Sequence, residues 1–207
     1  MKEEIETELD KIEHYQKFEI MKPFIGENYF NAKKRILLVA ESHFFASQSN
    51  INSGPTKWYS STLKDLHESK YDNINTRKIV ENSAHMVFRE LETVLSKSVD
   101  KYKNRALNNI AFINAFQRPA NKTGQSMKAL ASSFDFEVGI KTLTKVIEIL
   151  KPNLVVFISK YAWDNIGKQL PRVENTVYEF VNHPASVKYW HNSKYINSKY
   201  KLIKLLQ

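Results

Sequence analysis

The segment from Arg35 to Phe45, RILLVAESHFF, constrains the fold more than any other stretch of the chain. It opens with branched apolar residues at 36–39 and closes with a polar group at 41–43 and two phenylalanines. A short apolar run without polar alternation is typical of a strand covered on both faces, because neither face meets water. Ligands of open parallel sheets bind beyond the carboxyl ends of the strands. The sequence therefore predicts a buried strand with a candidate site directly after it.

The same layout recurs along the chain. Further strands are predicted at residues 109–113, 154–158 and 177–181, and helices at 1–20, 76–97, 135–150, about ten residues from Tyr161, and 193–206. Alternating strands and helices imply right-handed crossovers and a parallel sheet between two helix layers. We expect an α/β fold, a three-layer α/β/α sandwich with a four-stranded parallel sheet. One domain would span residues 1–207, with residues 1–30 as an N-terminal packing helix and lead-in.

Composition excludes several classes of protein. A hydrophobic content of 42% over 207 residues is too high for a globally disordered chain. The absence of cysteine excludes disulfides, thiolate zinc sites and cysteine-held iron–sulphur clusters, and no H-x-x-x-H pair occurs. We therefore expect neither a metal nor a cofactor. No apolar run approaches the length of a membrane span, and the acidic N-terminus is unlike a signal peptide. We expect a monomeric, cytoplasmic protein without a membrane partner.

The net charge of +9 favours acidic partners. A basic surface attracts phosphate backbones without reading their sequence. Many lysine-rich chains bind nothing acidic, so the charge shifts the expectation toward nucleic acid only modestly.

A long polar stretch at residues 46–62 contains two large aromatic side chains, Trp58 and Tyr59. Long loops in compact domains are usually functional or mobile. Folding back onto the core is the commoner fate of such side chains. The functional alternative is a platform on which a flat ring stacks.

Polar residues follow each of the four predicted strands: residues 41–43, Asn114, residues 159–160 and residues 183–186. Taken singly, a polar residue at a strand end usually caps the next helix. Together they supply a carboxylate, an amide and two imidazoles to one edge of one sheet. An amide matches the paired edge of a nucleobase, and a histidine before proline could hydrogen-bond a developing anion. No Ser-His-Asp arrangement and no glycine-rich phosphate loop is recognisable.

Four segments, VAESHF, IAFINAFQRP, KPNLVVFISKYAWDNI and FVNHPAS, resemble motifs of the uracil-DNA glycosylase superfamily in order and spacing. The first occupies the position of G-E-A-P-G or G-Q-D-P-Y. The second resembles the strand-two segment of the branch that carries an iron–sulphur cluster. The third is similar to the strand-three segment that begins K-P, and the fourth resembles H-P-S. The likeness runs from about Ile36 to Leu206.

The resemblance implies a DNA base-excision glycosylase, a hydrolase of DNA repair that flips a uracil-like or damaged base into its pocket and hydrolyses the N-glycosidic bond. Its DNA substrate would be single-stranded or damaged. Carried over, Glu41 would hold the base or a water and His183 would stabilise the departing base, as catalytic residues. Base-binding positions are Ser42, Phe44, Trp58 and Asn114, with Asn114 reading the base edge and Trp58 stacking. DNA-contacting positions are Ser159, Lys160, Ser186, the apolar wedge Val187, Lys188 and Lys194.

The chain also departs from the family pattern. Ser42 stands where the most active branch has Asp, His43 replaces the motif's Pro, and Ala40 its leading Gly. The Ser of H-P-S is displaced to Ser186, and the cluster cysteines are absent. A catalytically inactive nucleic-acid or nucleotide binder of the same fold is therefore the alternative, and an enzyme acting on a small N-glycoside is a third.

Overall fold

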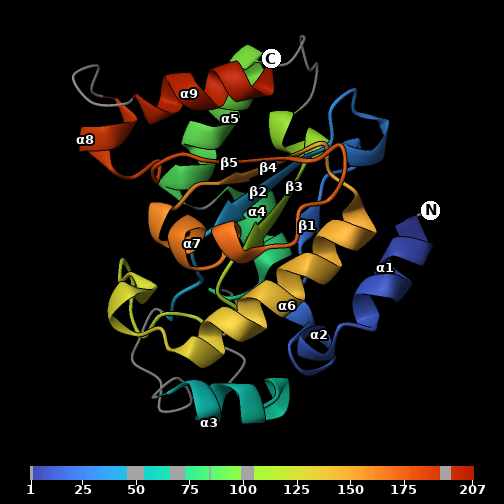
Figure 1. Ribbon diagram of the computed structural model, residues 1–207, viewed down its shortest axis with the longest axis vertical. Coiled ribbons are helices and arrows are strands. Elements are labelled where there is room, and N and C mark those ends of the chain that lie inside the picture. The colour runs from blue at the N-terminus through green and yellow to red at the C-terminus, as the bar shows by residue number, and fades with distance from the viewer. Residues whose placement is uncertain (1, 46–53, 66–72, 84, 99–104, 192–196) are drawn as a thin grey trace.

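A five-stranded mixed sheet lies between two layers of helices (Figure 1). The computed structural model describes the chain except for residues 1, 46–53, 66–72, 84, 99–104 and 192–196. The strands are β1 (Phe24–Ile25), β2 (Ile36–Ala40), β3 (Ile110–Asn114), β4 (Leu154–Phe157) and β5 (Val177–Phe180). Their order in the sheet is β1-β3-β2-β4-β5, and all pairs are parallel except β1 with β3. The α/β class is confirmed.

The expected sheet of four parallel strands is wrong in one detail, because β1 adds an antiparallel fifth strand. Phe24 pairs with Phe112, and the backbone N–H of Gly26 then donates to the Ile110 carbonyl at 2.9 Å. Gly26 allows this approach, since a Cβ at that position would overlap the backbone of Asn108. A two-residue strand has no periodicity that a sequence could show.

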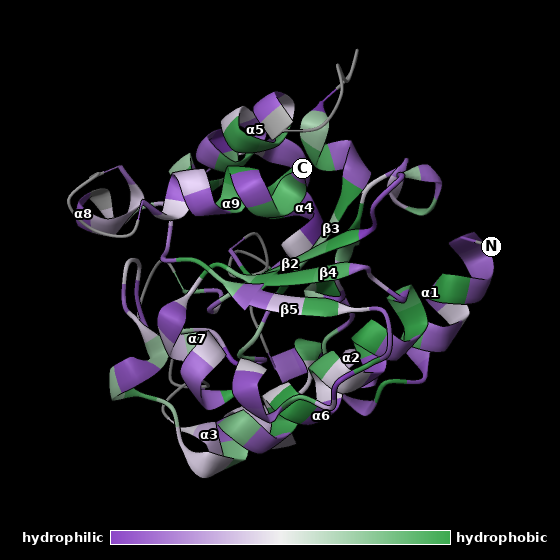
Figure 2. Cartoon of the chain, turned by 45° about the horizontal axis from the view of Figure 1, so that its top comes forward, coloured by the Kyte–Doolittle hydropathy of each residue, from purple (hydrophilic) through white to green (hydrophobic). Residues whose placement is uncertain are grey.

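Helices on the two faces of the sheet bury separate cores. One face carries α4 (Thr76–Asn82), α5 (Met86–Ser98), α8 (Val187–Trp190) and α9 (Ser198–Leu206). The other carries α1 (Lys2–Asp10), α2 (Glu13–Lys17), α3 (Pro55–Ser60), α6 (Ser133–Leu150) and α7 (Lys160–Asn165). Short 3₁₀ helices span Glu19–Met21, Tyr29–Asn31, Leu63–Asp65, Ala106–Asn109, Met127–Ala129 and Gly167–Gln169. Figure 2 shows the apolar strands between these layers.

The uninterrupted apolar character of β2 follows from this double cover. Leu37 and Val39 enter the core beneath α6, whereas Ile36, Leu38 and Ala40 enter the core beneath α5. All five side chains are buried. Because both faces of the strand are dry, no position along it favours a polar residue.

Several predicted helices are shorter than expected. The expected helix at 1–20 is divided into α1, α2 and a 3₁₀ turn, and that at 76–97 into α4 and α5. Ser83 ends α4 in the left-handed conformation, with φ of 47°, which a helix cannot continue. The helix after β4 has six residues rather than about ten. The last helix begins at Ser198 rather than 193, because the side chain of Asn197 caps it by accepting the Tyr200 N–H; residues 192–196 lie outside the described residues.

Polar contacts align the amino ends of β2 and β4. The Arg35 carbonyl accepts hydrogen bonds from the backbone N–H groups of Asn153 and Leu154, at 2.8 and 3.2 Å. The Arg35 N–H in turn donates to the Asn153 side-chain oxygen at 2.9 Å. These contacts precede the paired run from Ile36 opposite Leu154.

A buried ion pair fixes the start of α6. Arg118 donates to both oxygens of Asp135, at 2.8 and 2.9 Å, and both side chains are almost completely buried. Asp135 also forms a capping box with Ser132. Burial alone would raise the pKa of Asp135, but hydrogen bonds from Arg118 and Ser132 hold it below its ordinary value. The segment after β3 is thereby tied to the helix that follows.

No helix in the described part of the chain has the length and apolar character that crossing a membrane requires.

Candidate functional site

A cavity of about 620 Å³ opens at the carboxyl ends of β2 and β3. Five of the residues predicted from the sequence line this cavity together: Glu41, Ser42, Phe44, Asn114 and His183. They come from the end of β3 and from the segments after β2 and β5, which are distant in sequence. The cavity has the size of an ordinary small-molecule site.

Asn114 is the most informative residue of this cavity. It is the last residue of β3, paired with Ala40 of β2, and only 5% of its surface is exposed. Its backbone carbonyl accepts a hydrogen bond from the Gln117 side chain at 2.6 Å. No described residue forms a hydrogen bond with its side-chain amide. The amide lines the cavity, where it can donate and accept hydrogen bonds with a ligand.

Glu41 joins three parts of the chain through its carboxylate. One oxygen accepts hydrogen bonds from the Ser126 hydroxyl at 2.6 Å and the Met127 N–H at 2.8 Å. The other oxygen accepts one from the Ser159 hydroxyl at 2.7 Å. Through these three hydrogen bonds, the carboxylate holds the segments around it in place. The same bonds make it less suited to activating a water.

His183 presents a neutral imidazole. Its Nδ1 accepts a hydrogen bond from the Ala185 N–H at 3.1 Å, so a neutral ring carries its proton on Nε2. Burial lowers the pKa of His183, and the charge of Glu41 partly opposes this shift. At neutral pH the ring is therefore a hydrogen-bond donor through Nε2.

His43, which replaces the proline of the resembled motif, has a packing role. Its Nε2 lies 2.8 Å from the Thr76 hydroxyl, and that hydroxyl donates to the Met21 carbonyl at 3.3 Å. Because the hydroxyl proton is used there, His43 is the donor to Thr76. Burial, followed by the charge of His85, lowers the pKa of His43 to about 3. A neutral imidazole thus ties the end of β2 to α4.

Phe44 is the aromatic ring of the predicted set that reaches the cavity. It meets His85 edge-on with ring centroids 5.4 Å apart, and Phe88 and Phe112 also line the wall. A flat ligand would therefore meet apolar aromatic surface on one side.

Trp58 lies in the core and does not line this cavity. It is 0% exposed, its ring stacks on Phe18 at 4.2 Å, and its Nε1 donates to the Gln117 carbonyl at 2.8 Å. Its neighbour Tyr59 is also buried and donates to Asp135 at 3.1 Å. The prediction of Trp58 as a stacking platform is corrected, because the helix α3 turns both rings inward.

Of the predicted DNA-contacting residues near α7, Ser159 caps the helix. Its hydroxyl accepts a hydrogen bond from the Ala162 N–H at 3.2 Å while donating to Glu41. Lys160 is exposed and forms an ion pair with Asp164. Ser159 therefore joins the site through Glu41, whereas Lys160 stays on the surface.

The other predicted DNA-contacting residues lie around α8. The Ser186 carbonyl accepts the Trp190 N–H at 2.8 Å, and Val187 begins the helix. Lys188 is exposed, with its Nζ 5.4 Å from the centroid of the Tyr189 ring. Lys194 lies outside the described residues.

The segment 121–126 was not predicted as part of the site, and it lines the cavity through Thr123, Gly124, Gln125 and Ser126. Its available signal was the turn dipeptide Thr123-Gly124 shortly after Asn114, since Gly124 adopts φ of 72°. A turn has no hydrophobic periodicity that would predict its conformation. The sequence also does not show which other segments a turn lies next to in the fold.

The cavity has no cationic lining among the described residues. Among the lining residues that the structure describes, Glu41 is the only carboxylate, and the remaining polar side chains are hydroxyls, amides and imidazoles. In a chain with a net charge of +9, none of the described lining residues is a lysine or an arginine.

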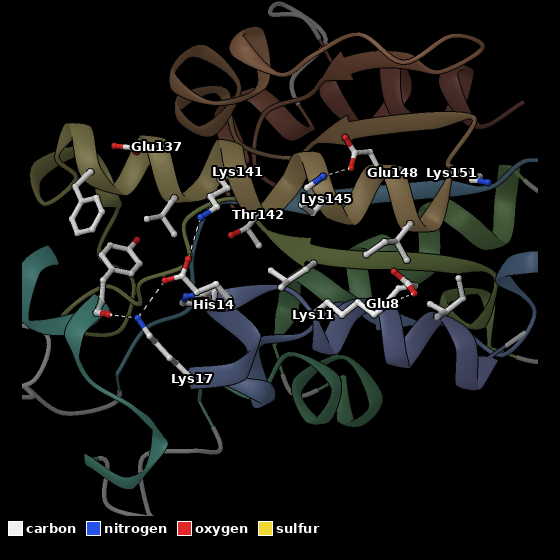
Figure 3. A pocket seen from close by; sticks show the side chains of 17 residues that line it. Glu8, Lys11, His14, Lys17, Glu137, Lys141, Thr142, Lys145, Glu148 and Lys151 are labelled. Atoms are coloured by element: carbon white, nitrogen blue, oxygen red, sulfur yellow. Dashed lines mark hydrogen bonds and ion pairs between the residues drawn. The ribbon is translucent and has the colours of Figure 1, made fainter.

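A larger groove of about 860 Å³ lies between α1, α2 and α6 (Figure 3). Its charged side chains largely pair with one another: Lys141 lies 3.1 Å from Glu13, and Lys145 lies 2.8 Å from Glu148. None of the residues predicted for the site lines it. The cavity at the strand ends is therefore the better candidate despite its smaller volume.

No known family model matches the chain, and a search of curated proteins finds no significant match.

Proposed function

We propose that this protein is a DNA base-excision N-glycosylase that binds a uracil-like or damaged base in the cavity at the strand ends. The observation that carries this proposal is the amide of Asn114 at the end of β3, which lines the cavity and forms no hydrogen bond with a described residue. A carboxamide can donate and accept at once, which matches the hydrogen-bonding edge of a nucleobase.

The lack of a cationic side chain among the described lining residues supports a base rather than a nucleotide as the group that enters. A phosphate would need a cationic or N–H-rich site, and no lysine or arginine is among the described lining residues. A base flipped out of a polynucleotide fits this arrangement, because its phosphates remain outside the cavity. The net charge of +9 would then act on the DNA backbone at the surface.

His183 supplies the chemistry for a departing base. Its Nε2–H, fixed by the hydrogen bond from Ala185 to Nδ1, would donate to negative charge that develops on the base. The adjoining Pro184 restricts the loop, so the donor needs little reorganisation. Phe44 would contact the ring as an apolar surface.

A catalytically inactive binder of the same ligand is the second candidate. Both oxygens of Glu41 already accept hydrogen bonds from the protein, and Ser42 offers no carboxylate beside it. The described part of the cavity thus lacks an unoccupied carboxylate base for water. This observation favours binding without hydrolysis.

The deciding experiment measures release of free base from oligonucleotides that each contain one uracil, hypoxanthine or alkylated base. Wild type should release at least one base, and Asn114→Ala and His183→Ala should abolish release. Lys145→Ala, an exposed substitution on α6, is the matched control and should leave release unchanged. Salt-sensitive DNA binding without release from any oligonucleotide would support the inactive binder. Absence of both binding and release would refute both candidates.

A further inference from the structure

The segment 121–126 is held at both of its ends against the candidate site. Before it, the Ala120 N–H donates to the His43 carbonyl at 2.8 Å, and the Phe45 N–H donates to the Ala120 carbonyl at 3.0 Å. At its carboxyl end, the Ser126 hydroxyl and the Met127 N–H donate to Glu41. A loop fixed at both ends has little conformational freedom left to lose when a ligand binds.

A tight turn inside this segment directs one side chain to the cavity. The Gln125 N–H donates to the Lys122 carbonyl at 3.2 Å, and Gly124 takes the left-handed conformation with φ of 72°. Gln125 consequently lines the cavity, while Gly124 and Thr123 form its exposed rim.

The Gln125 amide is the second carboxamide that lines the cavity beside Asn114. Its Oε1 is buried and has no hydrogen-bond partner among the described residues. A solvent-facing loop residue could have placed this group in water, whereas the anchored turn withdraws it from water and leaves it unpaired. An unpaired buried carboxamide in a cavity wall is expected to gain its partner from a ligand.

We propose that Gln125 is a second base-reading residue, which with Asn114 selects a base carrying hydrogen-bonding groups on two edges. This inference rests on the proposed function and extends it to substrate class. Keto or amino bases such as uracil and hypoxanthine belong to this class, whereas the unsubstituted rings pyrimidine and purine do not. Glu41 is then a positioning residue, since its carboxylate holds the end of the loop that carries Gln125.

The test compares the affinities of free bases by titration calorimetry. Wild type should bind uracil more tightly than pyrimidine, and hypoxanthine more tightly than purine, because only the substituted bases use both amides. Gln125→Met keeps the side-chain length but removes the hydrogen bonds. It should lower both affinity ratios about tenfold, with the parent-ring affinities unchanged. Asn114→Leu should lower the ratios by a similar factor.

Two controls separate a failure of this inference from a failure of the proposed function. Gln16→Met, an equivalent change at an exposed position of α2, should leave both ratios as in wild type. If Asn114→Leu lowers the ratios and Gln125→Met does not, the role of Gln125 is refuted and the base site stands. If wild type binds none of the four compounds, the base site and the role of Gln125 are both refuted.

Discussion

The buried histidine of α2 makes the stability of the fold depend on pH. His14 packs against the rings of Tyr15, Phe18 and Tyr59, with centroids 5.5–6.0 Å away, and its Nε2 has no partner among the described residues. Burial, reinforced by the charge of Lys17 and opposed by that of Glu13, lowers its pKa to about 3. The folded protein therefore holds this imidazole neutral.

The sign and size of the effect follow from the two pKa values of His14. The unfolded chain takes up the proton near pH 6.5, whereas the folded protein does so only near pH 3. Between these values the unfolded state binds more protons, so stability falls as the pH falls through this window. Lowering the pH from 7 to 5 should therefore remove about 2 kcal/mol through His14 alone.

The assay is urea unfolding of wild type and His14→Phe at pH 7, 6 and 5. The phenylalanine keeps a ring in the aromatic cluster but cannot titrate, so the variant should lose about 2 kcal/mol less than wild type over this range. His43 and His183 are present in both proteins, and their contributions cancel in the difference. His191→Phe, at an exposed position, is the control. Equal pH dependence of wild type and His14→Phe would refute the reasoning.

Three further predictions concern the stability of the fold, each measured by urea unfolding at pH 7. Arg118→Met should cost about 3–5 kcal/mol, because it leaves the carboxylate of Asp135 buried without its partner; a cost below 1 kcal/mol would contradict the buried pair. Ser132→Ala should cost about 1 kcal/mol through loss of the α6 cap, and Ser132→Gly should cost less. Gly26→Ala should cost more than 1 kcal/mol, since the added methyl group overlaps the Asn108 backbone; Gly54→Ala, where a Cβ meets nothing within 4 Å, is its control.

The four parallel strands could be predicted from the sequence because each is an unbroken apolar run. The observed strands agree with the expected ranges to within one residue at each end. The strand β1 could not be predicted, since two residues carry no pattern and its pairing depends on the glycine that follows it. The break between α4 and α5 depends on the conformation of Ser83, which the apolar stripe crosses without interruption.

The convergence of Glu41, Asn114 and His183 could also be predicted, because parallel strands bring their carboxyl ends to one edge. The hydrogen-bond partners that surround these three residues could not be predicted. Glu41 bonds to Ser126 and Ser159, which lie 85 and 118 residues further along the chain, and no local pattern reports such pairings. Trp58 fills a place in the core, which was the commoner expectation for an aromatic side chain in a polar stretch, and its assignment as a base-stacking residue was wrong.

The polar contacts between Arg35 and Asn153 have a consequence at the far end of the sheet. A strand that is apolar on both faces lacks the polar alternation that helps to set register, so contacts at its ends gain importance for alignment. A slip of one residue would move β2 by about 3.3 Å along β4. That distance exceeds the 2.7 Å between the bonded oxygens of Glu41 and Ser159. The contacts between Arg35 and Asn153 at the amino ends of β2 and β4 therefore help to set the distance between Glu41 and Ser159 at the carboxyl ends.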